Sequence, residues 1–139
     1  AQTHTAHLEV EFLDPQTNCY ALTSRDGELL AYCTFGQDAR VPGGDYRAEA
    51  LDIGLGVRPD LTGQGRGLVF VQAVLEFAQE RFAPVVCRVT VAAFNQRALR
   101  VWEKAGFRRT TSFDRAKDGM PFVLLTRACR SLSNSPTGG

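Results

Sequence analysis

The sequence contains little histidine and no surplus of charge. Its only two histidines lie within the first seven residues, which makes a histidine-based zinc site or a Ser-His catalytic pair hard to build. Sixteen basic residues against fifteen acidic ones leave a net charge of +1, and this balance argues against a polybasic nucleic-acid binder. No stretch of ~18 apolar residues occurs, so no membrane-spanning helix is expected. We expect neither nucleic acid nor membrane as a partner, and no metal.

The four cysteines form no closely spaced pair. Cys19, Cys33, Cys87 and Cys129 are widely and irregularly separated. A chain of 139 residues can bury an adequate core without covalent links, so the sequence favours free thiols in a reducing compartment over a disulfide framework. The first residues also lack the basic start and apolar run of a signal peptide. A cytoplasmic location is therefore expected.

Composition and length indicate one globular domain. Hydrophobic residues make up 44% of the chain and charged residues 22%, close to the average for globular proteins. We predict a single domain over residues 1–130, because the small polar residues 131–139 are typical of a disordered tail.

Hydrophobic periodicity predicts a mixed α/β fold. An Asp26-Gly27 pair indicates a hairpin, and the apolar residues of 66–82 recur at helical spacing. Five phenylalanines are expected in the core: Phe70, Phe77, Phe82, Phe94 and Phe107. The expected strands are 8–13, 18–24, 29–35, 50–57, 85–91, 107–113 and 122–127, and the expected helices are 66–82 and 95–104.

Five of the 13 glycines fall between positions 54 and 67. The segment Thr62-Gly63-Gln64-Gly65-Arg66-Gly67 leads into the predicted helix 66–82. Glycines let the backbone approach a ligand, and a helix start offers free N–H groups, so this pattern is typical of a pyrophosphate cradle. A Walker loop is excluded because no Gly-Lys-Ser/Thr occurs. A dinucleotide fingerprint fits poorly, because the glycine spacing differs and Cys87 stands where an acidic residue is required. A plain glycine turn is the remaining alternative.

A second segment, Asn95–Phe107 (NQRALRVWEKAGF), narrows these readings. Together with the glycine segment it resembles the GNAT superfamily of acyl-CoA-dependent N-acetyltransferases, over about residues 20–113. Two residues depart from the family pattern: Thr62 replaces a usual Gln or Arg, and Trp102 replaces a frequent Tyr. The positions that match are Gly63, Gly65 and Gly67 in the first segment and Asn95, Ala98, Val101, Glu103, Lys104, Gly106 and Phe107 in the second.

The resemblance implies a central, mostly antiparallel twisted sheet with two splayed strands, flanked by helices. It also implies acetyl-CoA or coenzyme A as co-substrate, with the pantetheine arm running along the strand that ends at Val57. Arg66, Arg97 and Arg100 are candidates for the cofactor's phosphates, although each also fits a solvated helix face. The residues expected to bind the cofactor are Leu55, Gly56, Val57, Thr62, Gly63, Gln64, Gly65, Arg66, Gly67, Asn95, Ala98 and Trp102. For Asn95, a simple helix cap is an equal alternative.

Three residues are candidates for the chemistry of acetyl transfer. The backbone N–H of Val57 would hydrogen-bond the thioester carbonyl, as in an oxyanion hole. Asp52 is the first candidate for the general base, because it lies in an apolar strand on the face of Gly54 and Gly56. Glu49 is the second. The alternative for Asp52 is a carboxylate held by neighbouring arginines or backbone donors.

The expected function is transfer of an acetyl group to a primary amine by direct attack within a ternary complex. A non-catalytic acyl-CoA-binding or sensor domain is the alternative, supported by Trp102 in place of tyrosine. The acceptor, a small-molecule or peptide amine, cannot be read from the sequence, and a homodimer is common in the family. The family usually places two helices between its first and second strands, whereas only residues 14–18 are available here. The acceptor-binding half is therefore expected to be shortened or absent.

Overall fold

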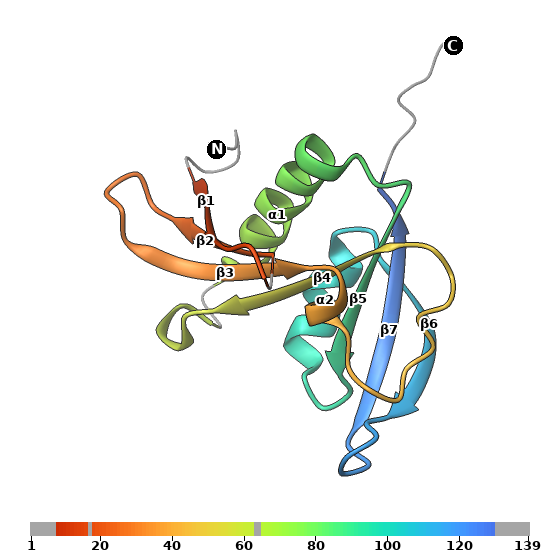
Figure 1. Cartoon of the computed structure of the whole chain (residues 1–139). Coiled ribbons are helices and arrows are strands. Elements are labelled where there is room, and N and C mark those ends of the chain that lie inside the picture. Colours follow the sequence, from red (N-terminus) through yellow and green to blue (C-terminus); the bar gives the residue numbers. More distant parts are fainter. Residues whose placement is uncertain (1–7, 17, 63–64, 130–139) are drawn as a thin grey trace.

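The computed structural model describes residues 8–16, 18–62 and 65–129. In this part of the chain seven strands form one mixed sheet with the order β1-β2-β3-β4-β5-β7-β6 (Figure 1). The tail predicted at 131–139 lies outside the described residues. The strands are β1 (Glu9–Asp14), β2 (Cys19–Thr23), β3 (Leu29–Phe35), β4 (Leu51–Val57), β5 (Val86–Ala92), β6 (Arg108–Asp114) and β7 (Pro121–Ala128), and the helices are α1 (Gly67–Phe82) and α2 (Gln96–Lys104), with short 3-10 turns η1 (Gln37–Ala39) and η2 (Pro59–Leu61).

The neighbours β4 and β5 are parallel and separate part-way along their length. They pair only where Leu51–Ile53 lie beside Cys87–Val89, whereas β3 stays paired with β4 up to Val57. All other neighbouring strands are antiparallel. The predicted mostly antiparallel sheet with two splayed strands is thereby confirmed.

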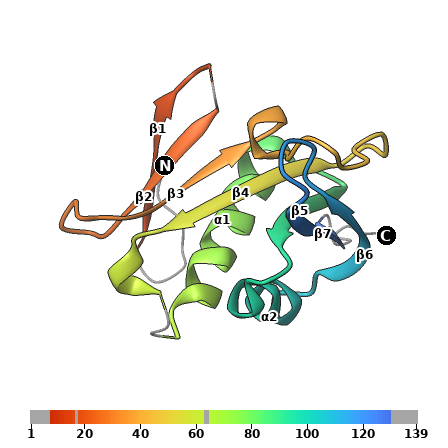
Figure 2. The same cartoon turned by 90° about the horizontal axis from the view of Figure 1, so that it is seen from below.

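The two faces of the sheet are covered differently. Both helices pack on one side, which we call the inner face (Figure 2). On the opposite side, the outer face, the connection 36–50 between β3 and β4 crosses over β5 and β7 (Figures 1 and 2). The separation of β4 from β5 therefore opens the sheet between a helical layer and a loop layer.

The inner face holds an apolar core because strand side chains alternate between the two faces. Ile53 of β4 and Leu125 of β7 meet Phe70 and Val74 of α1 there, and each of these side chains is at most 2% exposed. Phe94 departs from the expectation for the phenylalanines. It is 71% exposed, because it precedes α2 in a turn rather than on a packed helix face.

Cys87 and Cys129 form a disulfide, so the expectation of four free thiols is wrong. The antiparallel pairing of β5 with β7 places these residues 5.7 Å apart between Cα atoms although 42 positions separate them. Sequence spacing carries no trace of this strand pairing. Cys19 and Cys33 are free, and burial raises the pKa of the Cys33 thiol to about 12.

The connection between β1 and β2 is short. Only residues 15–18 link the two strands, which pair as antiparallel neighbours. The expected shortening of the region between the first two strands is confirmed. The longer connection 36–50 lies over the outer face instead.

Candidate active site

The backbone of β4 presents polar groups where β5 has parted from it. The N–H of Arg58 donates to the carbonyl of Leu30, and the carbonyl of Asp52 accepts from Gly36. Even-numbered residues of β4 are therefore bonded to β3, and the N–H and C=O groups of Leu55 and Val57 point the other way, toward the divergence. This edge can pair with an extended ligand as a further strand would.

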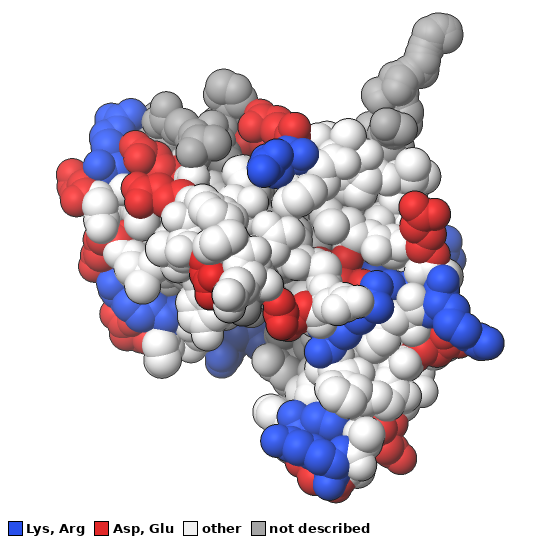
Figure 3. Space-filling view, in the orientation of Figure 1, with Lys and Arg blue, Asp and Glu red and all other residues white. Residues whose placement is uncertain are grey.

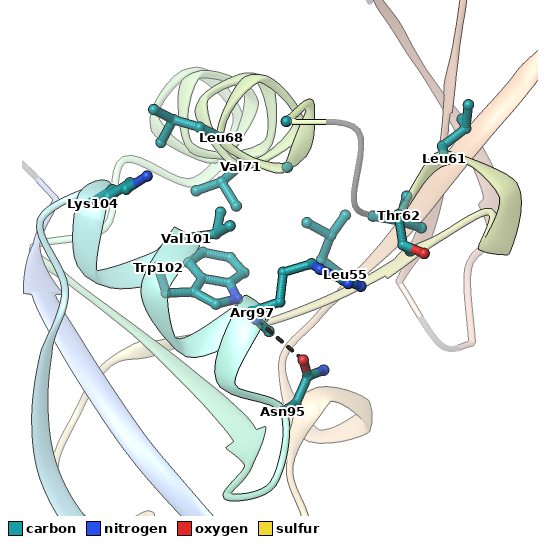
Figure 4. A pocket seen from close by; sticks show the side chains of 14 residues that line it. Leu55, Leu61, Thr62, Leu68, Val71, Asn95, Arg97, Val101, Trp102 and Lys104 are labelled. Carbon is teal, nitrogen blue, oxygen red and sulfur yellow. Dashed lines mark hydrogen bonds between the residues drawn. The ribbon is translucent and has the colours of Figure 1, made fainter.

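A cavity of about 450 Å³ lies between this edge and the two helices (Figure 4). Leu55 comes from β4, Leu68 and Val71 from α1, and Trp102 from α2. Each of these side chains lies on the wall of the same space. The complete lining is Leu55, Val57, Leu61, Thr62, Gly65, Gly67, Leu68, Val71, Asn95, Arg97, Ala98, Val101, Trp102 and Lys104.

Glycines at the start of α1 leave room for a ligand beside its backbone and let the helix lie close to α2. Gly65 has φ +73°, a conformation that favours glycine, and open space lies beside it. At Gly67 an added Cβ would come 3.1 Å from a methyl group of Val101, so glycine lets the start of α1 lie against α2. No side chain caps α1 within the described residues. Among the described residues, no side chain accepts from the first-turn N–H groups, which lie with the positive end of the helix dipole at the cavity.

The segment before the glycines is fixed by Arg58. Its guanidinium binds Asp60 in η2 at 2.6 Å and Glu28 at 2.9 Å, and it also donates to the carbonyl of Leu29. Hydrogen bonding from Arg58 holds the pKa of Asp60 below its usual value. Since η2 leads directly to Thr62, this network anchors one wall of the cavity to the β2–β3 turn.

Asn95 and Trp102 shape the α2 side of the cavity. The Asn95 side chain accepts a hydrogen bond from the N–H of Ala98 at 3.1 Å, so it caps α2 (Figure 4). Its exposed amide nitrogen remains available as a donor. Trp102 is only 5% exposed and packs edge-to-face on Phe107, with ring centroids 5.0 Å apart.

Most of the residues predicted to bind the cofactor line this one cavity: Leu55, Val57, Thr62, Gly65, Gly67, Asn95, Ala98 and Trp102. Gly63 and Gln64 lie outside the described residues. Gly56 faces the outer side, where an added Cβ would meet the ring of Tyr32 at 2.8 Å. Arg66 lies over the ring of Phe70, 5.2 Å from its centroid, rather than in the lining.

Sequence reasoning missed Leu61, Leu68, Val71, Val101 and Lys104 as cavity residues. Helical spacing could have found several of them, because residues three or four apart share a face. Val71 lies four positions after Gly67, and Val101 lies three after Ala98. Leu61 carries no such signal, because it comes from a single 3-10 turn.

Asp52 matches the alternative given for it in the sequence analysis, a carboxylate held by neighbouring arginines. Its carboxylate accepts two hydrogen bonds from Arg88, at 2.6 and 2.9 Å, and one from Arg40 at 2.8 Å. Asp52 is 2% exposed and Arg88 is 3% exposed. The group lies on the outer face and does not line the cavity. Its lone pairs are occupied by arginines, which suits a positioning role better than proton abstraction.

Glu49 is exposed and precedes β4, at the end of the strand opposite Val57. The structure therefore places both base candidates away from the cavity. On the outer face, acidic and basic side chains of the described residues are interspersed around the connection 36–50 (Figure 3). Within the described part of the chain, no cluster of three or more potential metal ligands occurs, and no helix is long and apolar enough to cross a membrane.

Comparison with known proteins agrees with this geometry. The family model of the GNAT acetyltransferases matches residues 2–107, most of the chain. The protein therefore belongs to the GNAT acetyltransferase family. No curated protein matches the sequence significantly.

Solved structures of this family share the fold. A GNAT-family acetyltransferase from Bacillus anthracis gives a TM-score of 0.63 at 16% identity, covering 81% of this chain and 66% of that one. A GNAT-family protein from Bordetella pertussis gives 0.64 at 25%, covering 82% and 67%. A spermidine N-acetyltransferase SpeG mutant from Vibrio cholerae gives 0.66 at 12%, covering 84% and 66%. This chain thus spans about two thirds of their length.

Proposed function

We propose that the protein transfers an acetyl group from acetyl-CoA to a primary amine by direct attack within a ternary complex. The observation that carries this proposal is the parting of β4 from β5 beside a cavity whose far wall is the uncapped start of α1. An extended arm ending in a pyrophosphate matches both features. Bound acetyl-CoA supplies a thioester whose acetyl carbon an amine can attack.

Each wall of the cavity has a defined part in binding. Leu55 and Val57 offer backbone groups for strand-like pairing with the pantetheine arm, and Gly65 and Gly67 admit the pyrophosphate to the N–H groups of α1. Thr62, Ala98 and Trp102 enclose the arm, and the Asn95 amide donates to it. Arg97 and Lys104 line the same cavity and supply positive charge for phosphates.

The chemistry relies on one backbone donor. The Val57 N–H points toward the divergence, and in this proposal it stabilises negative charge on the thioester oxygen as the amine attacks. Among the described lining residues there is no Cys or Ser to accept the acetyl group first, which favours direct transfer. A thiol has a pKa of about 8.5, so the thiolate can leave without the family's usual tyrosine. Trp102 then acts by packing.

The proton of the attacking amine passes to water in this proposal. Asp52 and Glu49 remain the residues that the sequence nominates as base, but the arginine contacts of Asp52 and the exposure of Glu49 favour a water-mediated route. Homodimerisation and a cytoplasmic location also stay predictions. The disulfide removes one of the two arguments for that location, the expectation of free thiols.

The test combines binding with turnover. We expect coenzyme A to raise the melting temperature, with no effect of NAD or ATP, and acetyl-CoA to release thiol when a panel of primary amines is added. Tight coenzyme A binding without turnover on any amine would favour the non-catalytic sensor. A thermal shift with NAD or ATP but none with coenzyme A would reject the acyl-CoA assignment.

A further inference from the structure

Arg40 lies beside the point where β4 and β5 separate, and only one of its three guanidinium nitrogens donates a hydrogen bond to a described residue. Its Nε atom donates to Asp52, while none of the described residues accepts a hydrogen bond from its two Nη atoms. The side chain is 36% exposed and lies over the ring of Tyr46, 5.3 Å from the centroid. The guanidinium is thus held in place and still presents donors to solvent.

The charge of Arg40 is not balanced by its protein partner. Arg88 alone binds both oxygens of Asp52, so the cluster of two arginines and one carboxylate carries a net positive charge. The nearby acidic Asp45 is hydrogen-bonded by Arg47, which together with the charge of Arg88 lowers its pKa to about 2; Arg47 balances its charge, so the excess positive charge beside Asp52 remains. Asp38 in η1 is exposed and, among the described residues, makes no ion pair with Arg40. An anion would complete this cluster.

The outer face of β4 leads from Asp52, the partner of Arg40, past two glycines toward Val57. On the outer face, Asp52 is followed by Gly54 and Gly56, which add no side chain to that surface. Side chains of β3 cover both positions: the Thr34 hydroxyl lies 2.6 Å from where a Cβ of Gly54 would be, and the half-exposed Tyr32 ring lies 2.8 Å from where a Cβ of Gly56 would be. A substrate that joins Arg40 to Val57 therefore passes over Thr34 and Tyr32. Ala39 contacts the Gly54 position, so the chain that carries Arg40 is seated at the start of this strip.

We infer that Arg40 selects the acceptor: the substrate is a primary amine that also carries a carboxylate, which the Nη atoms of Arg40 bind while the amine reaches the thioester at Val57. This inference rests on the proposed function. A strand rise of about 3.3 Å per residue separates Asp52 from Gly56 by about 13 Å. The amine and the carboxylate must therefore be several bonds apart.

The same geometry argues against a polyamine acceptor. The solved SpeG structures that share this fold are spermidine N-acetyltransferases from Vibrio cholerae, and their identities of 12% and 13% show the fold alone. A polycation needs acidic partners, whereas the donors without a described protein acceptor beside Asp52 belong to Arg40. The connection 36–50 is what brings this cation to the outer face.

The experiment uses a matched series of acceptors: 6-aminohexanoate, hexylamine and 1,6-diaminohexane. Acetyl transfer is followed by thiol release, and binding to the coenzyme A complex is measured separately by calorimetry. Because a charge-assisted hydrogen bond is lost with the carboxylate, we expect kcat/KM for 6-aminohexanoate to exceed that for hexylamine about ten-fold. Shorter and longer ω-amino acids then define the span.

Variants separate recognition from folding. Arg40→Gln should remove the preference for the carboxylate through KM, and Arg40→Lys should keep part of it. Arg47→Gln, an exposed arginine on the same connection, should leave the preference unchanged. Coenzyme A affinity and the melting temperature verify that each variant is folded.

The outcomes distinguish the inference from the proposed function. Transfer to all amines without a carboxylate preference, or a preference that survives Arg40→Gln, would overturn the inference alone. Absence of turnover would overturn the proposed function, and the calorimetric preference for 6-aminohexanoate would still decide the role of Arg40. Stronger use of 1,6-diaminohexane would replace the carboxylate acceptor by a polyamine.

Discussion

The two faces of the sheet around the β4–β5 divergence are stabilised by different interactions: apolar packing on the inner face, and ion pairs with hydrogen bonds on the outer face. On the inner face, most cavity walls are apolar helix and strand side chains together with glycines, and the positions of most of them follow from local patterns in the chain. On the outer face, a buried ion cluster holds the connection 36–50 against the sheet. Arg88 donates to the carbonyl of Ala48, and Tyr46 shares a hydrogen bond with Thr90.

Under the proposed function, the inner face binds the cofactor and the outer face meets the acceptor. Shape and backbone donors then hold the extended arm, and Arg97 and Lys104 are the two basic side chains of the cavity lining that face its phosphates. In the described part of the chain, no helix lies between β1 and β2 to cover the outer face, and long-range ion pairs position a loop there instead. The comparison predicts that substitutions which remove a buried charge on the outer face lower the stability of the protein. Substitutions which add side-chain volume on the inner face should weaken coenzyme A binding.

The largest effect is expected from Asp52→Ala. Removing the carboxylate leaves Arg88 buried and unpaired, and breaking a buried pair costs about 3–5 kcal/mol. We expect chemical denaturation to show a loss of this size. In the folded fraction, coenzyme A affinity should stay unchanged because Asp52 does not line the cavity.

Asp45→Ala is the matched control, because it removes a carboxylate from an exposed pair on the same connection. Its denaturation midpoint should equal that of the parent protein. The isosteric Asp52→Asn decides whether Asp52 positions the connection 36–50 or acts as the general base. Unchanged stability together with abolished turnover would restore Asp52 as the base and contradict the positioning role.

The residues of the inner-face cavity could largely be predicted from the sequence, whereas the ion cluster of the outer face could not. Strand and helix positions, the cap at Asn95 and the glycines at α1 are local signals, and the observed elements lie within one or two residues of those expected. Arg40, Asp52 and Arg88 come from three separate segments, so their cluster depends on the parallel register that pairs Asp52 with Arg88. The disulfide was missed for the same reason.

The second prediction concerns the disulfide, which fastens β5 to the chain beyond β7. Cys129→Ser opens a loop of 42 residues, and the chain-entropy argument gives a loss of up to roughly 4 kcal/mol. Thermal unfolding should show a lower melting temperature and no further change on adding a reductant. Cys19→Ser, at a free cysteine, should behave as the parent protein does. Equal sensitivity of Cys129→Ser and the parent protein to reductant would contradict a stabilising bond.

The third prediction tests shape on the inner face. Gly67→Leu should weaken coenzyme A binding by about ten-fold or more, because the added side chain must fill the cavity or push against Val101. Gly67→Ala is the graded control. Its Cβ meets only a methyl group at 3.1 Å, and alanine favours the helix, so a smaller loss is expected. Calorimetric titration measures both, and equal affinities for the two variants would contradict the cavity as the binding site.

The smallest effect is expected at Trp102, where packing and acid catalysis give different results. If Trp102 only packs against Phe107 and the cofactor arm, Trp102→Phe and Trp102→Tyr should retain kcat within about three-fold of each other, since both keep an aromatic ring. A tyrosine that protonates the leaving thiolate would instead raise kcat above the phenylalanine variant, with a dependence on pH near the thiol pKa of about 8.5. Steady-state rates between pH 6 and 10 measure this. A gain of ten-fold or more, confined to Trp102→Tyr, would show that thiolate departure limits this enzyme, and the inner face would then contribute chemistry as well as shape.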